Sequence, residues 1–255
     1  MSIGSIRRAD QLIEPARRFQ EVLQAGVTAA ADGALVTYGI QPRYPATGYG
    51  YIKLGDERLV VDGITVNHVD RFVEKPDAIT AERYLEESGY RWNSGIFTWR
   101  VDVVRSALSE HCPDLSQALQ PLGASFGTDS FAAELARVYP GLQKISIDYA
   151  LMERAEAIDV VTADFDWDDV GSWDALYDHL SADEAGNRVE GEAFLQNCSG
   201  CLVVNDDGPL LTGINLQDLT LVARGGAVLA MPRGAGQGVK EMVGRLRQAG
   251  REGVL

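Results

Sequence analysis

The stretch EPARRFQEVLQAGVTAAADGALVTYGI, residues 14–40, carries the pattern that sets the fold class. Its first part places apolar side chains at helical spacing, at Phe19, Val22, Leu23 and Val27. Asp32 and Gly33 then form a turn signal, and a short apolar run follows over 34–40. The stretch therefore predicts a helix, a turn and a strand.

The same alternation continues downstream. Strand patterns cover 49–54, 63–73, 95–99 and 159–163. Helical patterns cover 78–87, 101–110, 130–138, 147–156 and 172–180. Strands that alternate with helices of about ten residues predict an α/β sheet with helical cover, most of it parallel.

After Asn187 the helical patterns stop and short apolar segments separated by turn residues take over. They lie at 194–195, 201–204, 210–211, 219–222 and 228–231. Their close spacing predicts short stacked strands, a turn or two of β-helix, closed by an amphipathic helix over 239–249. We expect a core domain over 1–185 and an appendage over 186–255, packed tightly together.

Composition narrows the function classes. The 37 Asp and Glu residues outnumber the 23 Lys and Arg residues, which gives a net charge of −14. Such a surface repels nucleic acid and anionic membranes, so a phosphate ligand needs a local group of cations. The sequence has no signal-peptide pattern and no run of about 18 apolar residues, and three cysteines argue against a disulfide scaffold. We expect a cytoplasmic protein without nucleic-acid or membrane partners.

Two polar motifs coincide with strand ends. In FVEKP, residues 72–76, an apolar strand runs into Glu74 and Lys75. A glutamate can accept from sugar hydroxyls and a lysine can meet a phosphate, although an exposed ion pair before a turn is the alternative. In WNSGIF, residues 92–97, Asn93 offers donors and an acceptor that suit vicinal hydroxyls, although Asn, Ser and Gly are also ordinary turn residues.

Three further segments carry weaker signals. TGYGY, residues 47–51, could hold a sugar or a base against its backbone, or form a plain hairpin. DWDDVGSW, residues 166–173, could cap a helix through Asp169 or Ser172, or supply one carboxylate to Mg²⁺ with a second from elsewhere. The CxxC at 198–201 lacks nearby partners for zinc, which favours small buried side chains, and the absence of a GxSxG motif disfavours hydrolase chemistry.

The order of these motifs is more specific than any one of them. From residue 9 to the C-terminus, the series closely resembles the mannose-1-phosphate guanylyltransferases, also called GDP-mannose pyrophosphorylases. The motifs are TYGIQP (37–42), TGYGY (47–51), FVEKP (72–76), WNSGIF (92–97), SIDYALME (146–153) and WDDVGSW (167–173). The resemblance implies a Rossmann-like nucleotidyltransferase core with a short left-handed β-helical tail.

It also implies that GMP is transferred from GTP to mannose 1-phosphate with release of pyrophosphate. Carried over by motif, Gly50 would meet the sugar, Glu74 its hydroxyls and Lys75 the phosphates. Asn93 would meet the mannose ring, and Asp148 would help to shape the sugar site.

The resemblance implies a Mg²⁺ site as well. ADQLI, residues 9–13, is similar to the family's metal-binding element, so Asp10 would be the second metal ligand beside Asp169. A mannose 1-phosphate oxygen would attack the α-phosphorus of GTP in line, with Mg²⁺ between the two aspartates and Lys75 neutralising phosphate charge. Lys75 and Asp169 are therefore the expected catalytic residues.

The sequence also departs from the family. Arg8 and Gln11 stand where the family has proline and histidine, and the glycine-rich loop with the arginine that cradles the GTP phosphates is not found. We therefore expect an N-terminally truncated core that turns over poorly, because phosphoryl transfer depends on positioning and charge neutralisation. The alternatives are a non-catalytic sugar-nucleotide-binding or regulatory homologue, and a transferase for another hexose 1-phosphate. The sequence leaves open whether the chain forms a homo-oligomer.

Overall fold

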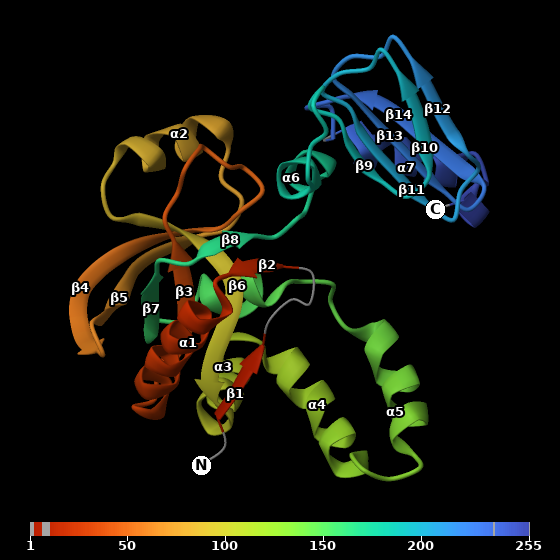
Figure 1. Cartoon of the computed structure of the whole chain (residues 1–255). Helices are drawn as coiled ribbons and strands as arrows, with labels where there is room; N and C mark the ends of the chain where they lie inside the picture. The colour runs from red at the N-terminus through yellow and green to blue at the C-terminus, as the bar shows by residue number, and fades with distance from the viewer. Residues whose placement is uncertain (1–2, 7–10, 237, 255) are drawn as a thin grey trace. The chain divides into compact units, whose positions relative to one another are not determined.

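The computed structural model describes residues 3–6, 11–236 and 238–254, with 3–6 described as backbone only. The chain forms two compact units, Met1–Asp169 and Val170–Leu255 (Figure 1). The division falls before the boundary that the sequence predicts near 185. The reason is α6 (Trp173–His179), whose Trp173, Leu176 and Tyr177 pack against strands of the second unit.

The first unit is built on a six-stranded sheet with the order β1-β6-β3-β7-β5-β4. Its strands are β1 (Ile3–Ile6), β3 (Leu35–Ile40), β4 (Tyr51–Val61), β5 (Ile64–Val73), β6 (Tyr90–Arg100) and β7 (Ile158–Ala163). A small antiparallel pair, β2 (Leu12–Glu14) with β8 (Asp166–Asp168), stands apart from the sheet. The α/β class predicted from the sequence is confirmed.

The expectation of a mostly parallel sheet is wrong for the strands that the structure describes. Among the pairs of this sheet, β3 with β7 is parallel and the other pairs are antiparallel. Asp62 and Gly63 both have positive φ, which closes β4 and β5 into a tight hairpin. An apolar run gives no direction to a strand, so this outcome could not be read from periodicity.

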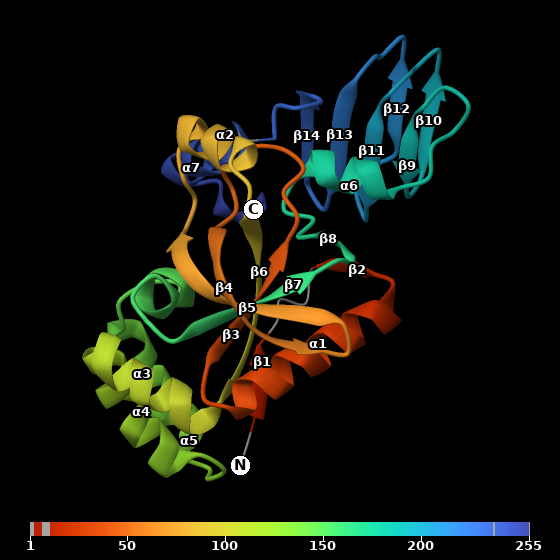
Figure 2. The ribbon, with the colours of Figure 1, turned by 90° about the vertical axis from the view of Figure 1, so that its left-hand side faces the viewer.

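Helices cover both faces of the sheet (Figure 2). On one face α1 (Ala16–Ala31) buries Phe19 and Val22 against a cluster that includes Val36 of β3. On the other face α3 (Val101–His111) packs beside Leu35. The chain continues through α4 (Pro113–Ser125), α5 (Phe131–Val138), the short helical turn η1 (Tyr139–Gly141) and the wide helical turn η2 (Asp148–Met152), while α2 (Ala78–Glu86) follows β5. None of the described helices is long and apolar enough to cross a membrane.

The second unit stacks short strands. They are β9 (Arg188–Glu190), β10 (Ala193–Gln196), β11 (Leu202–Asp206), β12 (Leu211–Ile214), β13 (Leu219–Arg224) and β14 (Ala227–Pro232), and α7 (Gly238–Gln248) and η3 (Glu252–Val254) follow. The pairs β9–β11, β11–β13 and β10–β12 are parallel, as coils of a β-helix require, whereas β14 runs antiparallel to β13. The left-handed sense of winding stays a prediction.

A polar clamp closes the start of this stack. The buried Asn187 amide donates to Asp183 Oδ2 (3.0 Å) and to the Cys198 carbonyl (2.9 Å), and it accepts from the Cys201 backbone N–H (3.1 Å). Cys198 and Cys201 are both buried free thiols in the apolar cluster of the coils. The two cysteines are therefore small core side chains, as the sequence predicts.

Candidate functional site

Three strand ends meet at one point of the first unit. Tyr51, the first residue of β4, pairs with Val73 of β5 and with Trp92 of β6. The neighbouring residues Gly50, Glu74 and Asn93 therefore come together. The Asn93 backbone N–H donates to the Gly50 carbonyl at 2.8 Å. The structure thus joins residues that are far apart in the sequence and that the motifs singled out separately.

A side chain at position 50 would force neighbouring side chains to shift. A Cβ placed there would run into Glu74 Oε2 and would lie 3.2 Å from Asn93 Cβ. At Gly48, two residues earlier, a Cβ would meet nothing within 4 Å. Close approach of Glu74 to the backbone is therefore the reason for glycine at position 50.

Glu74 and Lys75 form a polarised pair. Lys75 has a φ of 49°, a left-handed turn that brings two consecutive side chains together, and its Nζ donates to Glu74 Oε1 at 2.8 Å. The Glu74 side chain is 7% exposed whereas that of Lys75 is 50% exposed. The alternative of an exposed ion pair therefore does not describe Glu74.

The second carboxylate oxygen of Glu74 is buried and has no hydrogen-bond partner in the described part of the chain. Burial raises the pKa of the Glu74 carboxyl, and the hydrogen bond from Lys75 opposes this shift. The same bond raises the pKa of Lys75. The pair presents an oxygen that needs a donor beside an ammonium group that reaches solvent.

The Asn93 side chain is held by buried partners. Its Oδ1 accepts from the Thr37 hydroxyl (2.9 Å) and from the Gly95 backbone N–H (3.1 Å), while Nδ2 donates to Asp148 Oδ1 (2.9 Å). Asp148 comes from η2 and is itself buried. Because these bonds use the amide oxygen and one N–H, the second N–H is the polar atom that Asn93 can offer to a ligand.

Two residues of this site were not singled out by the sequence. Glu153 Oε1 accepts from the Glu74 backbone N–H at 2.8 Å, which fixes the segment that carries the Glu74–Lys75 pair. Thr37 orients Asn93 as described above. The available signals were weak: Glu153 ends the SIDYALME motif, and Thr37 is a hydroxyl residue within an otherwise apolar strand.

The predicted metal ligands are only partly described. Asp169 directly follows β8, and the Tyr49 hydroxyl donates to its Oδ1 at 3.1 Å. Asp10 lies outside the described residues. Over 11–236 and 238–254, no group of three His, Cys, Asp or Glu side chains is arranged to hold a metal ion. Ser172 caps α6 by accepting from the Ala175 N–H at 3.1 Å, so the capping interpretation of this motif is confirmed for Ser172.

The α/β fold and the order of the motifs together identify the chain as a member of the nucleotidyltransferases. The sequence profile described as "Nucleotidyl transferase" matches residues 5–186, and the chain belongs to this family. The sequence motifs resemble those of the mannose-1-phosphate guanylyltransferases, and the relatives of the chain confirm this resemblance.

The chain is 38% identical over 241 residues to a mannose-1-phosphate guanylyltransferase of Klebsiella pneumoniae, covering 94% of this chain and 51% of that protein. It is 35% identical to the alginate biosynthesis protein AlgA of Pseudomonas syringae pv. tomato, covering 95% of this chain and 50% of that protein. The chain therefore spans about half the length of the curated relatives it matches.

Among solved structures, one from Thermus thermophilus described as mannose-1-phosphate geranyltransferase superposes with a TM-score of 0.80 at 34% identity. The match covers 96% of this chain and 70% of that one. The agreement extends over almost the whole chain, so it includes strands of both units.

Proposed function

We propose that this chain carries the sugar 1-phosphate site of a nucleotidyltransferase that forms GDP-mannose and pyrophosphate from GTP and mannose 1-phosphate. The observation that carries the proposal is the buried Oε2 of Glu74, which has no hydrogen-bond partner among the described residues, beside the half-exposed ammonium of Lys75. The names of the relatives supply the substrates. Family resemblance supplies the identity of the sugar as mannose and of the base as guanine. It also supplies the cytoplasm as the compartment.

A hexose hydroxyl suits the orphan oxygen. An unpaired buried acceptor costs about 1–3 kcal/mol, and a hydroxyl donor from the ligand would recover this free energy. The remaining N–H of Asn93 would donate to another sugar oxygen. Because Thr37 and Asp148 fix the Asn93 amide from both ends, this donor is oriented before the ligand arrives.

Lys75 would meet the phosphate. Its side chain is held by Glu74 and stays half-exposed, so a phosphate oxygen can replace water around the ammonium. The net charge of −14 makes such local cations decisive for anion binding.

In the proposed reaction a phosphate oxygen of mannose 1-phosphate bonds to the α-phosphorus of GTP, and the bond from that phosphorus to the bridging oxygen of pyrophosphate breaks. No side-chain nucleophile is needed, because the substrate oxygen attacks directly. Asp169, together with Asp10, would hold Mg²⁺, an ion usually bound by one or two carboxylates plus substrate phosphates. Bound there, the ion would neutralise charge on the phosphates.

Titration of mannose 1-phosphate into the chain by calorimetry tests the site. Gly50→Ala puts a methyl group against Glu74 Oε2 and should weaken binding about ten-fold or more. Gly48→Ala, the matched control, adds the same methyl group in open space and should bind as the wild type does. Equal affinities for both variants would reject the site.

Incubation with GTP, mannose 1-phosphate and Mg²⁺, followed by chromatography for GDP-mannose, tests the reaction. Product that disappears in Lys75→Ala and in Asp169→Asn supports the catalytic roles. Sugar phosphate binding without product would reject catalysis by this chain and favour a sugar-nucleotide-binding homologue.

A further inference from the structure

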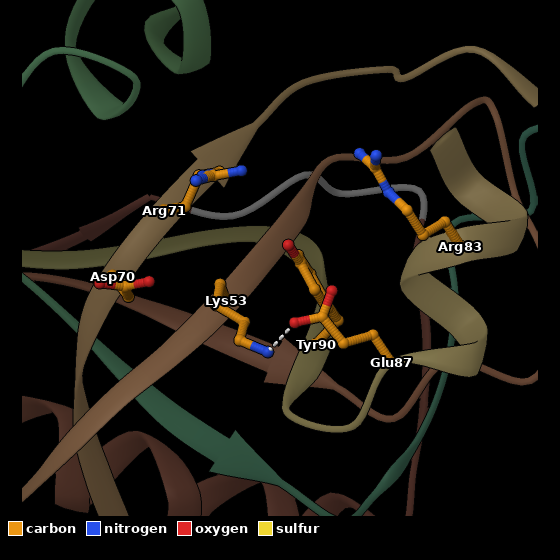
Figure 3. A pocket seen from close by; sticks show the side chains of 6 residues that line it. All are labelled: Lys53, Asp70, Arg71, Arg83, Glu87 and Tyr90. Carbon is orange, nitrogen blue, oxygen red and sulfur yellow. Dashed lines mark hydrogen bonds and ion pairs between the residues drawn. The ribbon is translucent and has the colours of Figure 1, made fainter. Parts of the chain in front are cut away.

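A polar cavity lies beside the strands that lead to the Glu74–Lys75 pair. It has a volume of about 340 Å³ and is lined by Lys53, Asp70, Arg71, Arg83, Glu87 and Tyr90 (Figure 3). The lining comes from β4, β5, α2 and the turn into β6. None of these six side chains has a part in the proposed reaction.

Three cations converge on this cavity. Lys53 and Arg71 are directly opposite partners in the β4–β5 ladder, a placement of like charges that lowers the stability of a sheet. Lys53 is compensated, because its Nζ bonds to Glu87 Oε1 (2.6 Å) and to the Ser88 carbonyl (2.9 Å). The remaining lining residues thus set two arginines against one aspartate.

The two arginines are attracted electrostatically by Glu87 but are not held by a hydrogen bond to any described residue. Neither the Arg71 nor the Arg83 guanidinium forms a hydrogen bond or ion pair with a described residue, and both residues are exposed. The Arg83 guanidinium lies 5.5 Å from the centre of the Tyr84 ring. In Figure 3 the two guanidinium groups face the cavity from opposite sides, with the Tyr90 hydroxyl between them.

The Tyr90 ring is rigidly held below them. It is buried and stacks on Tyr84 with ring centroids 4.0 Å apart, and the ammonium of Lys53 lies 4.7 Å from its centre. A hydroxyl on a fixed ring between two planar cations is a set of donors arranged for a tetrahedral oxyanion.

We propose that this cavity is a second anion site, which binds a phosphoryl group of a free phosphate or of a phosphorylated metabolite between Arg71 and Arg83. The cations that line the cavity must attract the ligand strongly, because the chain as a whole is negatively charged and repels anions. A volume of about 340 Å³ lies within the range of small-molecule sites. The site does not depend on the proposed function.

The two arginines flank the segment that carries the Glu74–Lys75 pair. Arg71 lies near the end of β5 and Arg83 lies in α2, and the segment between these elements carries Glu74 and Lys75. An anion that bridges the arginines would brace both ends of this segment. The second anion site would therefore limit the motion of the Glu74–Lys75 pair.

Calorimetric titration of the full chain with orthophosphate, pyrophosphate and mannose 1-phosphate tests the proposal. Each is added separately at constant ionic strength, and the tightest ligand identifies the source of the phosphoryl group. All titrations are done in a Lys75→Ala background, which removes the phosphate partner of the first site. We expect saturable binding with a dissociation constant below about 1 mM for at least one of them.

Arg71→Gln with Arg83→Gln should weaken this binding about ten-fold or more, because charged hydrogen bonds are lost. Arg105→Gln, an exposed arginine of α3 outside the cavity, is the matched control and should leave the affinity unchanged. Glu87→Gln releases Lys53 and should tighten binding. Melting temperatures confirm that each variant is folded.

Four results would overturn the second anion site, and the first three concern the anions and the arginine variants. These three are no saturable binding of any of the three anions, binding that survives in the folded double arginine variant, and an equal loss of affinity in Arg105→Gln. Binding that is absent in the Lys75→Ala background but present with Lys75 would place the anion at the first site and would also overturn it.

Discussion

The surroundings of Glu74 in the first unit and of Asn187 in the second both bury polar side chains, yet the two regions differ in how those groups are paired. Around Asn187 the amide oxygen and both amide hydrogens have partners. Around Glu74 one carboxylate oxygen has none among the described residues. A fully paired group holds a fold together, whereas an unpaired buried group lowers stability unless a ligand supplies its partner.

The carboxylates of the two regions also respond oppositely to pH. Burial raises the pKa of Glu74 above its ordinary value. Hydrogen bonds from Asn187 and from the backbone N–H of Ala185 lower the pKa of Asp183. Acidification therefore relieves the cost of burying Glu74 and removes the contribution of Asp183 to stability.

The largest effect should come from Asn187→Ala. The change leaves the Cys198 carbonyl and the Cys201 N–H without their partner inside the second unit. We expect a loss of about 3 kcal/mol in the free energy of unfolding of that unit, measured by urea denaturation. Gln217→Ala, at an exposed position of the same unit, should change it by less than about 0.5 kcal/mol. A similar small loss for both variants would contradict the clamp.

Thr37→Val tests the paired part of the first unit. It keeps the shape of the side chain but removes the hydroxyl that donates to Asn93 Oδ1. We expect a loss of about 1–2 kcal/mol in stability, together with weaker binding of mannose 1-phosphate because the Asn93 amide is less well oriented. Thr65 lies on β5, and its hydroxyl forms no hydrogen bond with a residue that the structure describes, so Thr65→Val should leave binding unchanged. Unaltered binding in Thr37→Val would remove Thr37 from the site.

Glu74→Gln should have a smaller effect of opposite sign on stability. At neutral pH the wild type buries a charge whose pKa is raised by that burial, so the variant with the neutral amide should be more stable than the wild type while sugar binding is lost. The gain should shrink as the pH falls through the raised pKa, where the wild-type carboxyl becomes protonated. Thermal melts between pH 4 and pH 8 measure this difference, with exposed Glu82→Gln as the control. A variant less stable than the wild type at neutral pH would show that Glu74 serves the fold.

The smallest effect is expected for Asp183→Asn. The lowered pKa means that the carboxylate stabilises the second unit above the ordinary aspartate pKa, and that this contribution is lost as the pH falls through the lower folded value. The variant should melt slightly below the wild type at pH 7, and the two should converge only as the pH falls from the ordinary aspartate pKa through the lower folded value. Glu184→Gln, next to it in the sequence, should show no such convergence. A pH-independent difference would contradict the assignment.

Much of the fold can be predicted from local pattern, and the strand directions cannot. The spacing of Phe19, Val22, Leu23 and Val27 predicts α1, because burial of one face leaves a helical period in the sequence. The apolar segments after Asn187 correspond to β10 through β14. An apolar run has the same pattern in parallel and antiparallel sheets, so the pairing of β3, β5 and β7 depends on connections that periodicity does not report.

The residues of the candidate site can likewise be predicted only where the local sequence pattern marks them. Glu74, Lys75 and Asn93 stand out because a polar residue at the end or mouth of a strand is conspicuous in the sequence. Thr37 does not stand out, because its bond to Asn93 spans 56 positions and requires the folded sheet. The left-handed turn at Lys75 was equally hidden, since a non-glycine residue gives no local signal of a positive φ. Long-range pairing is what the sequence pattern leaves out.

The reversed direction of β14 has a consequence for the behaviour of the second unit in concentrated solution. A stack of parallel coils is a template on which further chains can polymerise into fibres. Here β14 turns back along β13, and Pro232 at its end has no N–H to donate. In the four-stranded sheet a neighbouring molecule therefore cannot continue the parallel ladder beyond β13, so this edge of the unit carries its own barrier against end-to-end growth.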